Sequence, residues 1–400
     1  MPSWAGMIRV SWYHYIMVQE ILIIFGILAS VFWMIQILCS AIVIRNQKKQ
    51  QIKSNLPPIS VIVPTYNEPI DRVVSTIESI LNQKNVALEI IVVDDGSTEP
   101  VVLDYDNVRV IRTENRGKRH AQITGIEIAK HDWIATIDSD TSLDENAIAY
   151  LITTILDENL DAATGSVFLS NEKTNMLTKM TSCMYWFSFY QERASQSLFK
   201  SVMCCSGALS VYSKEIILKH KEDYLNQTFF GHVCAAGDDR HLTNLFLLSG
   251  KTVGWSKNSK AWTHSPDKIG KFIKQQLRWI RSHVSSFYYI GKRIASWNII
   301  FAIFTMKLIF RYAYMLLLYF SMFSESIHNL SLWPFIIALI SVVIVTVIKT
   351  IIALMYTRKK EMAYLLAYSV YTFFIFNPVV FYGILTPTKV GWLTRNSKNP

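Results

Sequence analysis

The stretch ISVIVPTYNEP, residues 59–69, decides the fold class, because a β-branched apolar run ends abruptly in polar and acidic residues. LEIIVVDDGST at 88–98 and WIATIDSD at 133–140 repeat this pattern, and VRVIRT at 108–113 and DAATGSVFL at 161–169 supply further short apolar runs. Buried parallel strands have this appearance when a site lies at their carboxyl ends. Amphipathic helical stretches separate the runs, so we predict an α/β domain with a mostly parallel central sheet.

The bulk composition indicates a membrane protein that carries a soluble domain. The chain has 400 residues, of which 51% are hydrophobic, and a net charge of +10. Its lysines and arginines cluster beside hydrophobic segments, which is typical of anchoring at a cytoplasmic membrane face. No zinc-ligand spacing or nucleic-acid motif is present, so no nucleic-acid partner is expected. The five cysteines lack a CxxC pattern, which favours reduced thiols over a disulfide framework.

The first long apolar run predicts a membrane-spanning helix. Residues 21–44 carry no formal charge and are numerous enough to cross a bilayer. A cleavable signal peptide fits less well, since the run is too long and no small-residue cleavage site follows. The basic stretch RNQKKQQIK at 45–53 then predicts that the following domain is cytosolic.

The remaining domain boundaries follow from changes in hydrophobicity, charge and apolar periodicity along the chain. The predicted parts are an N-terminal segment with its transmembrane helix at 1–45, a cytosolic domain at 46–265, amphipathic interface helices at 266–297, transmembrane and re-entrant helices at 298–386 and a cytosolic tail at 387–400. The interface helices are inferred from the basic and aromatic run at 268–294, whose alternative reading is an ordinary surface helix.

The C-terminal apolar region raises a problem of topology. Hydrophobic segments lie at about 298–322, 330–356 and 363–386, and Asn377-Pro378 divides the third of them. Since proline breaks helices, we expect two short re-entrant or interfacial pieces. This arrangement leaves the basic tail after the third segment in the cytosol.

Acidic and polar side chains follow three of the predicted strands. They comprise Thr65, Tyr66 and Glu68 after the first strand, Asp94 and Asp95 after the second, and Asp138 and Asp140 after the third. Acids at strand ends are often only caps and turns, but three such ends in one α/β domain indicate a site. The Asp-x-Asp pair offers oxygen ligands for Mg²⁺ or Mn²⁺ bound to a diphosphate. Lys118 and Arg119 suit phosphate oxygens, although a solvated basic turn is the plainer reading.

The sequence GDDRHLTN, residues 237–244, places Asp238 and Asp239 side by side. Adjacent like charges resist ionising together, so the pair is either a solvated turn or part of a site. Arg240 is placed to offset the paired charge and to keep Asp239 ionised. Whether Asp238 takes part in chemistry or only positions its neighbour stays open.

Several motifs together resemble processive inverting family 2 glycosyltransferases, and class I hyaluronan synthases in particular. The motifs that carry the resemblance are VIVPTYNEP, VVDDGS, NRGKRHAQ, DSD, DAATGSV, ERASQSL, CSGALSVYSKEII, NQTFFGHVCAAGDDRHLTN and QQLRW, spread over about residues 58–285. The resemblance implies a GT-A type nucleotide-sugar transferase domain inserted between transmembrane helices, with amphipathic interface helices.

The resemblance also implies roles for individual residues. Asp239 would be the general base, with Asp238 beside it, and Asp140 the main metal ligand, with Asp138. Nucleotide contacts would come from Thr65, Tyr66, Glu68, Asp94, Asp95, Lys118, Arg119, Asp138, Gln275 and Arg278. Acceptor contacts would come from Cys234, Trp279, Ser206 and Gly207. Cys234 has a plain alternative as a small buried thiol.

Three features depart from the resembled family. The tail reads GWLTR at 391–395, where the family has Trp-Gly-Thr-Arg, so the spacing of Trp392 and Arg395 differs. Ala208 stands where proline is usual, on a loop expected to border the donor sugar. One N-terminal membrane helix is visible instead of two, which would place the N-terminus outside.

The expected function is alternating transfer from UDP-N-acetylglucosamine and UDP-glucuronate to a growing polysaccharide, which the membrane segments export. The expected setting is a monomer in contact with membrane lipid, multi-pass in the plasma membrane, with Mg²⁺ or Mn²⁺. The alternatives are a chitin-like or other capsular polymer made from UDP-N-acetylglucosamine, and a single lipid-linked transfer. An inactive scaffold or polysaccharide receptor fits less well, because Asp140, Asp239 and Trp279 are all present.

Overall fold

The computed structural model describes residues 4–234, 236–329 and 333–388. The chain divides into two units, one made of Met1–Leu38 and Ile299–Asn377, the other of Cys39–Asn298 and Pro378–Pro400. Each is described by itself. The divergent GWLTR stretch, with Trp392 and Arg395, lies outside the described residues.

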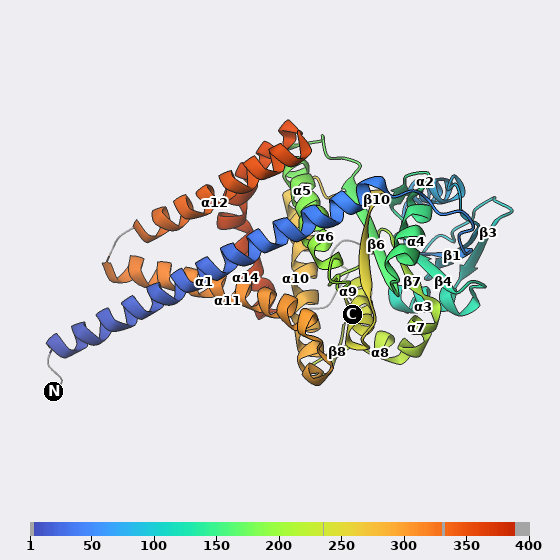
Figure 1. The fold of residues 1–400 in the computed structure, drawn as a ribbon. Helices are drawn as coiled ribbons and strands as arrows, with labels where there is room; N and C mark the ends of the chain where they lie inside the picture. The colour runs from blue at the N-terminus through green and yellow to red at the C-terminus, as the bar shows by residue number, and fades with distance from the viewer. Residues whose placement is uncertain (1–3, 235, 330–332, 389–400) are drawn as a thin grey trace. The chain divides into compact units, whose positions relative to one another are not determined.

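The larger unit is built on an eight-stranded sheet (Figure 1), whose order is β3-β2-β1-β4-β7-β6-β10-β5. Its strands are β1 (Ile59–Thr65), β2 (Leu88–Asp94), β3 (Val108–Arg112), β4 (Trp133–Thr136), β5 (Thr141–Leu143), β6 (Ala162–Leu169), β7 (Ser210–Ser213) and β10 (Val253–Thr263). β7 runs antiparallel to both of its neighbours and β5 is antiparallel to β10, whereas the other pairings are parallel. The prediction of a mostly parallel sheet in an α/β domain is confirmed.

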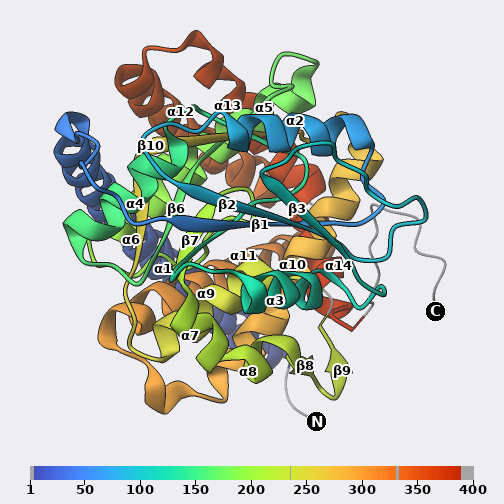
Figure 2. The ribbon, with the colours of Figure 1, turned by 90° about the vertical axis from the view of Figure 1, so that its right-hand side faces the viewer.

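Helices cover both faces of this sheet (Figure 2). α2 (Ile70–Leu81) and α4 (Ala147–Glu158) lie on one face, and α3 (Lys118–Ile128), α7 (Lys214–Lys219) and α9 (Asp238–Leu248) lie on the other. Every residue of β1 is buried, which explains its continuous apolar run. Side chains of β1, β2, α2 and α4 form one hydrophobic core that fixes the sheet and therefore the positions of its strand ends.

The remaining elements of this unit are short, apart from one long helix. They are α5 (Met176–Phe187), a π-helical turn (Ser188–Arg193), α6 (Ala194–Ser197), α8 (Lys221–Leu225), the hairpin β8 (Thr228–Phe229) and β9 (His232–Val233), α10 (Ile269–Gly291) and two 3-10 turns (Gln47–Lys49, Ile294–Ser296). α10 carries the QQLRW motif and packs against α9 and β8. It therefore lies beside the segment that begins with Asp238.

The segment after the first apolar helix is fixed to the sheet edge by Gln47. Its side-chain amide donates to the carbonyl of Trp255 at 2.8 Å and to Oε1 of Glu158 at 3.1 Å, and its Oε1 accepts from the Lys257 N–H at 2.7 Å. A buried amide with this many partners is satisfied at low cost. The basic linker is thus part of the domain and not a loose tether.

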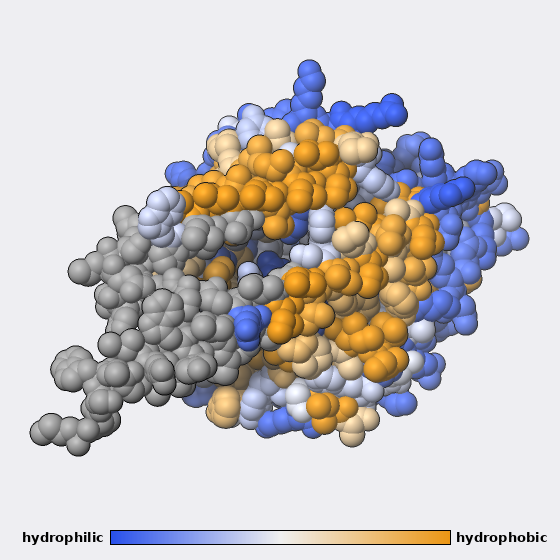
Figure 3. Space-filling view, turned by 60° about the vertical axis from the view of Figure 1, so that its left-hand side comes forward, coloured by the Kyte–Doolittle hydropathy of each residue, from blue (hydrophilic) through white to orange (hydrophobic). Residues whose placement is uncertain are grey.

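The smaller unit is helical. It contains α1 (Trp4–Asn46) as far as Leu38, α11 (Ile299–Asn329), α12 (Trp333–Thr357) and α13 (Tyr364–Tyr371), with a 3-10 turn (Lys360–Ala363) and a π-helical turn (Thr372–Phe376). The last helix, α14 (Asn377–Leu385), belongs to the larger unit from Pro378 onward. Within the described residues, three stretches are long and apolar enough to cross a membrane: Ile27–Lys49, Ile299–Phe323 and Lys360–Leu385. Figure 3 shows contiguous hydrophobic surface of the kind that such helices present.

The structure corrects the prediction that Asn377-Pro378 breaks the last apolar segment into two pieces. The chain stays helical from Tyr364 to Leu385, because the π-helical turn widens the helix just before the proline. Tyr319 donates to the carbonyl of Phe373, and the Asn377 amide donates to the Tyr319 hydroxyl at 3.2 Å. These bonds satisfy a backbone group that the irregular turn frees. How often the segment crosses a membrane stays a prediction.

Candidate active site

The carboxyl ends of β1 and β2 meet at one edge of the sheet, with Thr65 paired to Asp94. Asp94 accepts the Ser97 N–H at 2.9 Å and the Val101 N–H at 3.3 Å, and it lies 3.5 Å from Arg112. Its carboxylate is therefore held inside a turn of main-chain donors. A buried acid in such a turn shapes the rim of a site as well as lining it.

Asp95 is held by the next turn along the same edge. Its two oxygens accept the N–H groups of Arg116 at 3.0 Å and Gly117 at 2.9 Å. Burial raises the pKa of Asp95, while those two N–H donors act in the opposite direction. Asp95 thus ties the end of β2 to the start of α3 and positions Lys118.

The residues after β1 turn sharply away from the sheet. Thr65 is buried and its carbonyl accepts the Asp95 N–H at 2.9 Å. Tyr66 is half-buried, and the side chain of Glu68 is almost fully enclosed and lies 3.3 Å from Arg72. These three predicted nucleotide-contact residues therefore stand at the same edge as Asp94.

Lys118 joins two acidic side chains that are far apart in the sequence. Its Nζ lies 2.8 Å from Oδ1 of Asp138 and 2.7 Å from Oδ2 of Asp238. Burial alone would lower the pKa of Lys118, but the two carboxylates hold it well above its usual value. A permanently charged Lys118 therefore connects the end of β4 to the start of α9.

Asp138 and Asp140 follow β4 at the same edge. Burial raises the pKa of Asp140 to about 6, and the negative charge of Asp138 adds to the rise. Two close carboxylates in a buried setting favour binding a cation, since a cation would stabilise both ionised forms. Gly207 lies against this pair, because a Cβ on it would come within 2.9 Å of an Asp138 oxygen.

Arg119 points away from the acidic strand ends, and its nucleotide contact stays a prediction. Its guanidinium is buried and donates to the carbonyl of Tyr224 at 3.1 Å, to Oε1 of Gln227 at 2.6 Å and to the carbonyl of Ala236 at 3.3 Å. Because α3 turns Lys118 and Arg119 in different directions, only Lys118 lies with the acidic strand ends. Arg119 instead supports the loop that leads to Asp238.

Asp238 and Asp239 form the first turn of α9, which Gly237 begins with a φ of 79°. Burial opposes the ionisation of Asp238, but the Lys118 ammonium holds the pKa of Asp238 below its ordinary value. Burial raises the pKa of Asp239, and the charge of Asp238 adds to the rise. The environment therefore drives the pKa values of two adjacent aspartates in opposite directions.

Arg240 contributes less to this pair than its position in the sequence indicates. Its backbone N–H donates to Oδ1 of Asp239 at 2.7 Å, and its charge acts to lower the pKa of Asp239. The direct ion pair with the acidic dipeptide comes from Lys118 instead, 120 residues away in the sequence. The predicted offset of charge is present, but its main source is different.

The loop before β7 runs between the two acidic groups. The N–H of Ser206 donates to Thr164 Oγ1 at 3.0 Å, and the Asp138 N–H donates to the carbonyl of Gly207 at 3.0 Å. Gly207 therefore stands beside Asp138, and its predicted acceptor contact stays a prediction.

α10 brings the QQLRW motif against α5. The ring of Trp279 lies 6.4 Å from that of Tyr185, and burial, followed by the charge of Asp140, raises the pKa of Tyr185. Gln275 and Arg278 lie on the same helix, each with a buried side-chain polar atom. A row of buried polar groups on one helix is a feature of sites that bind a polar ligand.

Cys234 lies on the loop that Arg119 supports, beside Ser285 of α10. Burial raises the pKa of the Cys234 thiol, against a hydrogen bond with Ser285. Ser282 lies one turn before Ser285 on α10 and faces Gly237. A Cβ on Gly237 would fall 1.8 Å from the Ser282 hydroxyl, so only glycine allows α10 to approach this closely. The loop, α9 and the QQLRW helix are therefore closely packed together.

Comparison with known proteins decides the family. A family model described as "Glycosyl transferase family 2" matches residues 60–220. The hyaluronan synthase of Streptococcus pyogenes serotype M1 is 33% identical over 352 residues, which cover 84% of this chain and 83% of the relative. The chain belongs to glycosyl transferase family 2. An N-acetylglucosaminyltransferase of Azorhizobium caulinodans is 31% identical over 85% of this chain and 88% of the relative.

A solved structure confirms the fold of this glycosyltransferase. A mannosyltransferase from Pyrobaculum calidifontis, in complex with GDP-Man and Mn²⁺, superposes with a TM-score of 0.54 at 15% identity, over 89% of this chain and 99% of that chain. The GT-A type transferase fold predicted from the motifs is therefore confirmed, as is the resemblance to hyaluronan synthases and their relatives.

Sequence reasoning missed several groups that lie against the predicted site residues of this glycosyltransferase. Cys204 Sγ lies 3.7 Å from Oδ2 of Asp239, and Tyr185 faces Trp279. The guanidinium of Arg193 lies 4.1 Å from the ring centroid of Phe189 and bonds the loop before β7. The sequence signal was that Arg193 lies within the motif ERASQSL and that Cys204 directly precedes CSGALSVYSKEII.

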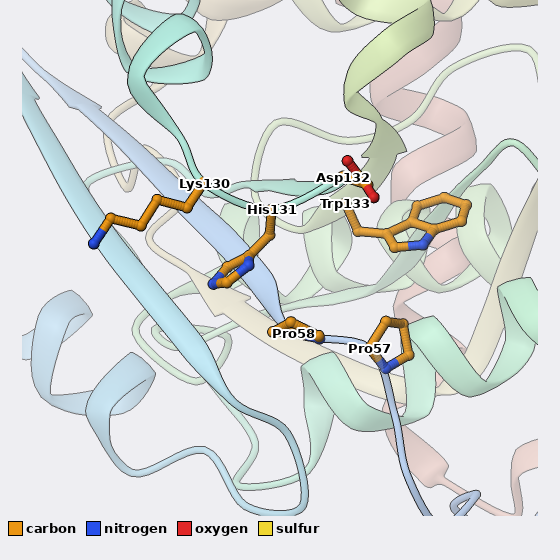
Figure 4. A pocket seen from close by; sticks show the side chains of 6 residues that line it. All are labelled: Pro57, Pro58, Lys130, His131, Asp132 and Trp133. Carbon is orange, nitrogen blue, oxygen red and sulfur yellow. The ribbon is translucent and has the colours of Figure 1, made fainter.

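A small cavity at the opposite edge of the sheet is unrelated to these groups. Its volume is about 160 Å³, and the residues that line it (Figure 4) are Pro57, Pro58, Lys130, His131, Asp132 and Trp133. Pro57 and Pro58 precede β1, and residues 130–132 precede β4, which Trp133 begins, so the cavity stands at the amino ends of these strands. Sites in α/β sheets form at the carboxyl ends, where Asp94 and Asp138 lie.

Proposed function

We propose that this glycosyltransferase is a membrane-embedded processive synthase that makes hyaluronan by alternating transfer from UDP-N-acetylglucosamine and UDP-glucuronate. The observation that carries the proposal is the 33% identity to a hyaluronan synthase along 84% of the chain. The aligned length exceeds that of the transferase domain alone, and three helices are candidate membrane spans. A shared membrane region suits an enzyme that passes its product out of the cell.

In this proposal Asp239 is the general base. An inverting transfer in one displacement needs one carboxylate that removes the proton of the acceptor hydroxyl as it attacks the anomeric carbon. Burial and the charge of Asp238 raise the pKa of Asp239, which makes its carboxylate a better proton acceptor near neutral pH. Asp238 has a different role, since its ion pair with Lys118 keeps it ionised and fixes the first turn of α9.

The acidic strand ends would hold the nucleotide and a divalent cation. Asp94 and Asp95 border the predicted uridine site, and Asp138 and Asp140 offer the carboxylate oxygens that Mg²⁺ and Mn²⁺ prefer. Within the described residues no group of three or more His, Cys, Asp and Glu side chains gathers around a point, so diphosphate oxygens and water would complete the coordination. When bound, the metal would offset the negative charge of the leaving UDP.

The opposite side of the site would hold the growing polysaccharide. Trp279 offers an aromatic face for a sugar ring, with Gln275 and Arg278 on the same helix. Cys234, beside Ser285 of this helix, and Ser206, in the loop before β7, would add acceptor contacts. The protein would be multi-pass in the plasma membrane with its transferase domain in the cytosol, as the basic linker at 45–53 indicates.

A second candidate is a synthase of a chitin-like or other capsular β-linked polymer from UDP-N-acetylglucosamine alone. The N-acetylglucosaminyltransferase of Azorhizobium caulinodans, at 31% identity over a similar length, favours it. Ala208 follows Gly207, which lies against the Asp138 carboxylate, and it stands at a position expected to border the donor sugar.

Membranes that contain the enzyme distinguish the two candidates. Both UDP-sugars are supplied with Mg²⁺ or Mn²⁺, and each is omitted in turn, while polymer and UDP release are measured. The hyaluronan proposal predicts polymer only when both donors are present, and digestion of that polymer by hyaluronidase. Polymer from UDP-N-acetylglucosamine alone that chitinase digests would establish the second candidate. Membranes with Asp239→Asn enzyme provide the background.

A further inference from the structure

The thiol of Cys204 lies directly against the carboxylate of Asp239, with Sγ 3.7 Å from Oδ2. The carbonyl of Cys205 is the other acceptor near this thiol, at 3.8 Å. A thiol has one proton to donate, and a carboxylate is the stronger and here the closer acceptor. The geometry therefore favours an S–H···O bond to Asp239.

Backbone bonds fix Cys204 in this position. The Arg193 Nε–H donates to its carbonyl at 3.0 Å. The neighbouring Cys205 N–H donates to Thr243 Oγ1 at 2.9 Å, and that hydroxyl donates to the carbonyl of Asp239 at 2.7 Å. The loop with Cys204 and Cys205 is thus linked to α9 twice: through the Thr243 hydroxyl, which bridges two main-chain groups, and through the Cys204 thiol.

The charge state of Cys204 suits a donor. Burial raises the pKa of its thiol to about 11, and the charge of Asp239 adds to the rise, so the thiol keeps its proton. The other carboxylate oxygen, Oδ1, accepts the Arg240 N–H at 2.7 Å. Each oxygen of Asp239 therefore has one fixed donor, which sets the plane of the carboxylate.

We propose that Cys204 is a positioning residue for the transfer reaction, in which its S–H donates to Oδ2 of Asp239 and directs the base toward the acceptor hydroxyl. The inference rests on the proposed role of Asp239 as base, but not on the identity of the polymer. The charged and titratable groups that face Asp239 are Asp238 and Arg240 on α9, Lys118 on α3, Tyr212 on β7 and Tyr224 on α8.

The test is the pH dependence of kcat/KM for UDP release, measured for Cys204→Ala and Cys204→Ser. In C204A the donor is gone and ionised Asp239 is less stable. The acidic limb, the fall of kcat/KM at low pH as the base is protonated, should therefore move upward by about 0.5–1 pH unit. At a pH well below this limb, kcat/KM should be about 3- to 10-fold lower than in the wild type. The serine hydroxyl of C204S is a better donor than a thiol, so its limb stays in place or moves downward.

Cys205→Ala is the matched control, since it removes the neighbouring thiol from the same loop and leaves the S–H of Cys204. Its acidic limb should coincide with that of the wild type, whatever its effect on stability. A purely structural role for Cys204 would lower kcat/KM equally at all pH values, and that result in C204A and C204S would overturn the inference. UDP affinity, measured for each variant, confirms that the site is folded.

Asp239→Asn separates the proposed role of Asp239 as base from the proposed positioning role of Cys204. If that variant retains wild-type turnover, Asp239 is not the base and the proposed mechanism fails. If it is inactive while C204A and C204S keep the wild-type limb, the mechanism stands and only the positioning role of Cys204 is refuted.

Discussion

Two pairs of adjacent aspartates in this glycosyltransferase have opposite environments. Asp94 and Asp95 end a buried strand, and four main-chain N–H groups donate to their carboxylates. Asp238 and Asp239 begin a helix, where one carboxylate pairs with the Lys118 ammonium and the other receives one main-chain N–H and one thiol. The Asp-Asp dipeptide thus occurs once with all its carboxylate oxygens bonded to main-chain N–H groups, and once with two carboxylates whose partners differ.

The difference shows what converts an acidic dipeptide into acid–base chemistry. In the first pair each carboxylate oxygen accepts one main-chain N–H, which leaves rigid acceptors that shape a binding rim, although burial still raises the pKa of Asp95. At the second pair a single cation serves one partner, so the pKa values of Asp238 and Asp239 move apart. Acid–base roles are found where the environment separates two such pKa values.

The largest expected effect comes from Asp239→Asn. Asparagine cannot take the proton of the acceptor hydroxyl, so we expect kcat to fall by about 10³-fold. UDP affinity, measured by titration, should stay within a factor of a few of the wild type, since no nucleotide contact is assigned to Asp239. Substantial polymer synthesis by this variant would refute its assignment as the base.

The counterpart at the other pair is Asp94→Asn, which should act on stability and nucleotide affinity. An amide replaces one acceptor oxygen with a donor, so a main-chain N–H loses its partner at a cost of about 1–3 kcal/mol. Thermal unfolding and UDP titration measure both consequences. Asp106→Asn, at an exposed aspartate, is the matched control and should leave both quantities unchanged. If Asp94→Asn instead abolished turnover while UDP affinity and stability stayed at wild-type values, as expected for Asp239→Asn, the two aspartate pairs would not differ in role.

Lys118→Met tests the cation that makes the second pair unequal. Without the ammonium, Asp238 and Asp239 repel each other more strongly, and the pKa of Asp239 rises further. We expect the acidic limb of kcat/KM to move upward by roughly one pH unit. A limb that stays in place, in an enzyme that still binds UDP, would show that Lys118 does not govern the base.

The smallest effect concerns the stability of Asp239→Asn. A carboxyl whose folded pKa is raised gives its full stability below its unfolded pKa, and that contribution is lost as the pH rises through the folded value. At pH 7 ionised Asp239 therefore destabilises the fold, and asparagine relieves this by roughly 0.5–1 kcal/mol. Thermal unfolding should show a higher midpoint than the wild type at pH 7, and the difference should vanish below about pH 3, under the unfolded pKa.

The sequence predicts the parts of the site that follow from strand periodicity. Acids placed after β1, β2 and β4 meet at one edge because parallel strands align their carboxyl ends, and this needs no tertiary information. The fold class was therefore accessible from residues 59–169 alone.

Contacts between distant segments were not accessible in this way. Lys118 pairs with Asp238 across 120 residues, and Arg119 turns away from it, because α3 directs consecutive side chains to different surroundings. Similarly, Pro378 predicts a break, but the π-helical turn at Thr372–Phe376 keeps the helix continuous. These contacts and the continuity of the helix depend on tertiary packing, which a local sequence motif does not predict.

The most direct test of the account is the pH profile of Asp238→Asn. The substitution removes the negative charge beside Asp239 and frees Lys118 from its ion pair, and both changes favour ionised Asp239. We therefore expect the acidic limb of kcat/KM for UDP release to move to lower pH, opposite to the shift in Lys118→Met. A limb that stays in place or moves to higher pH would contradict the claim that Asp238 and Lys118 set the pKa of the base.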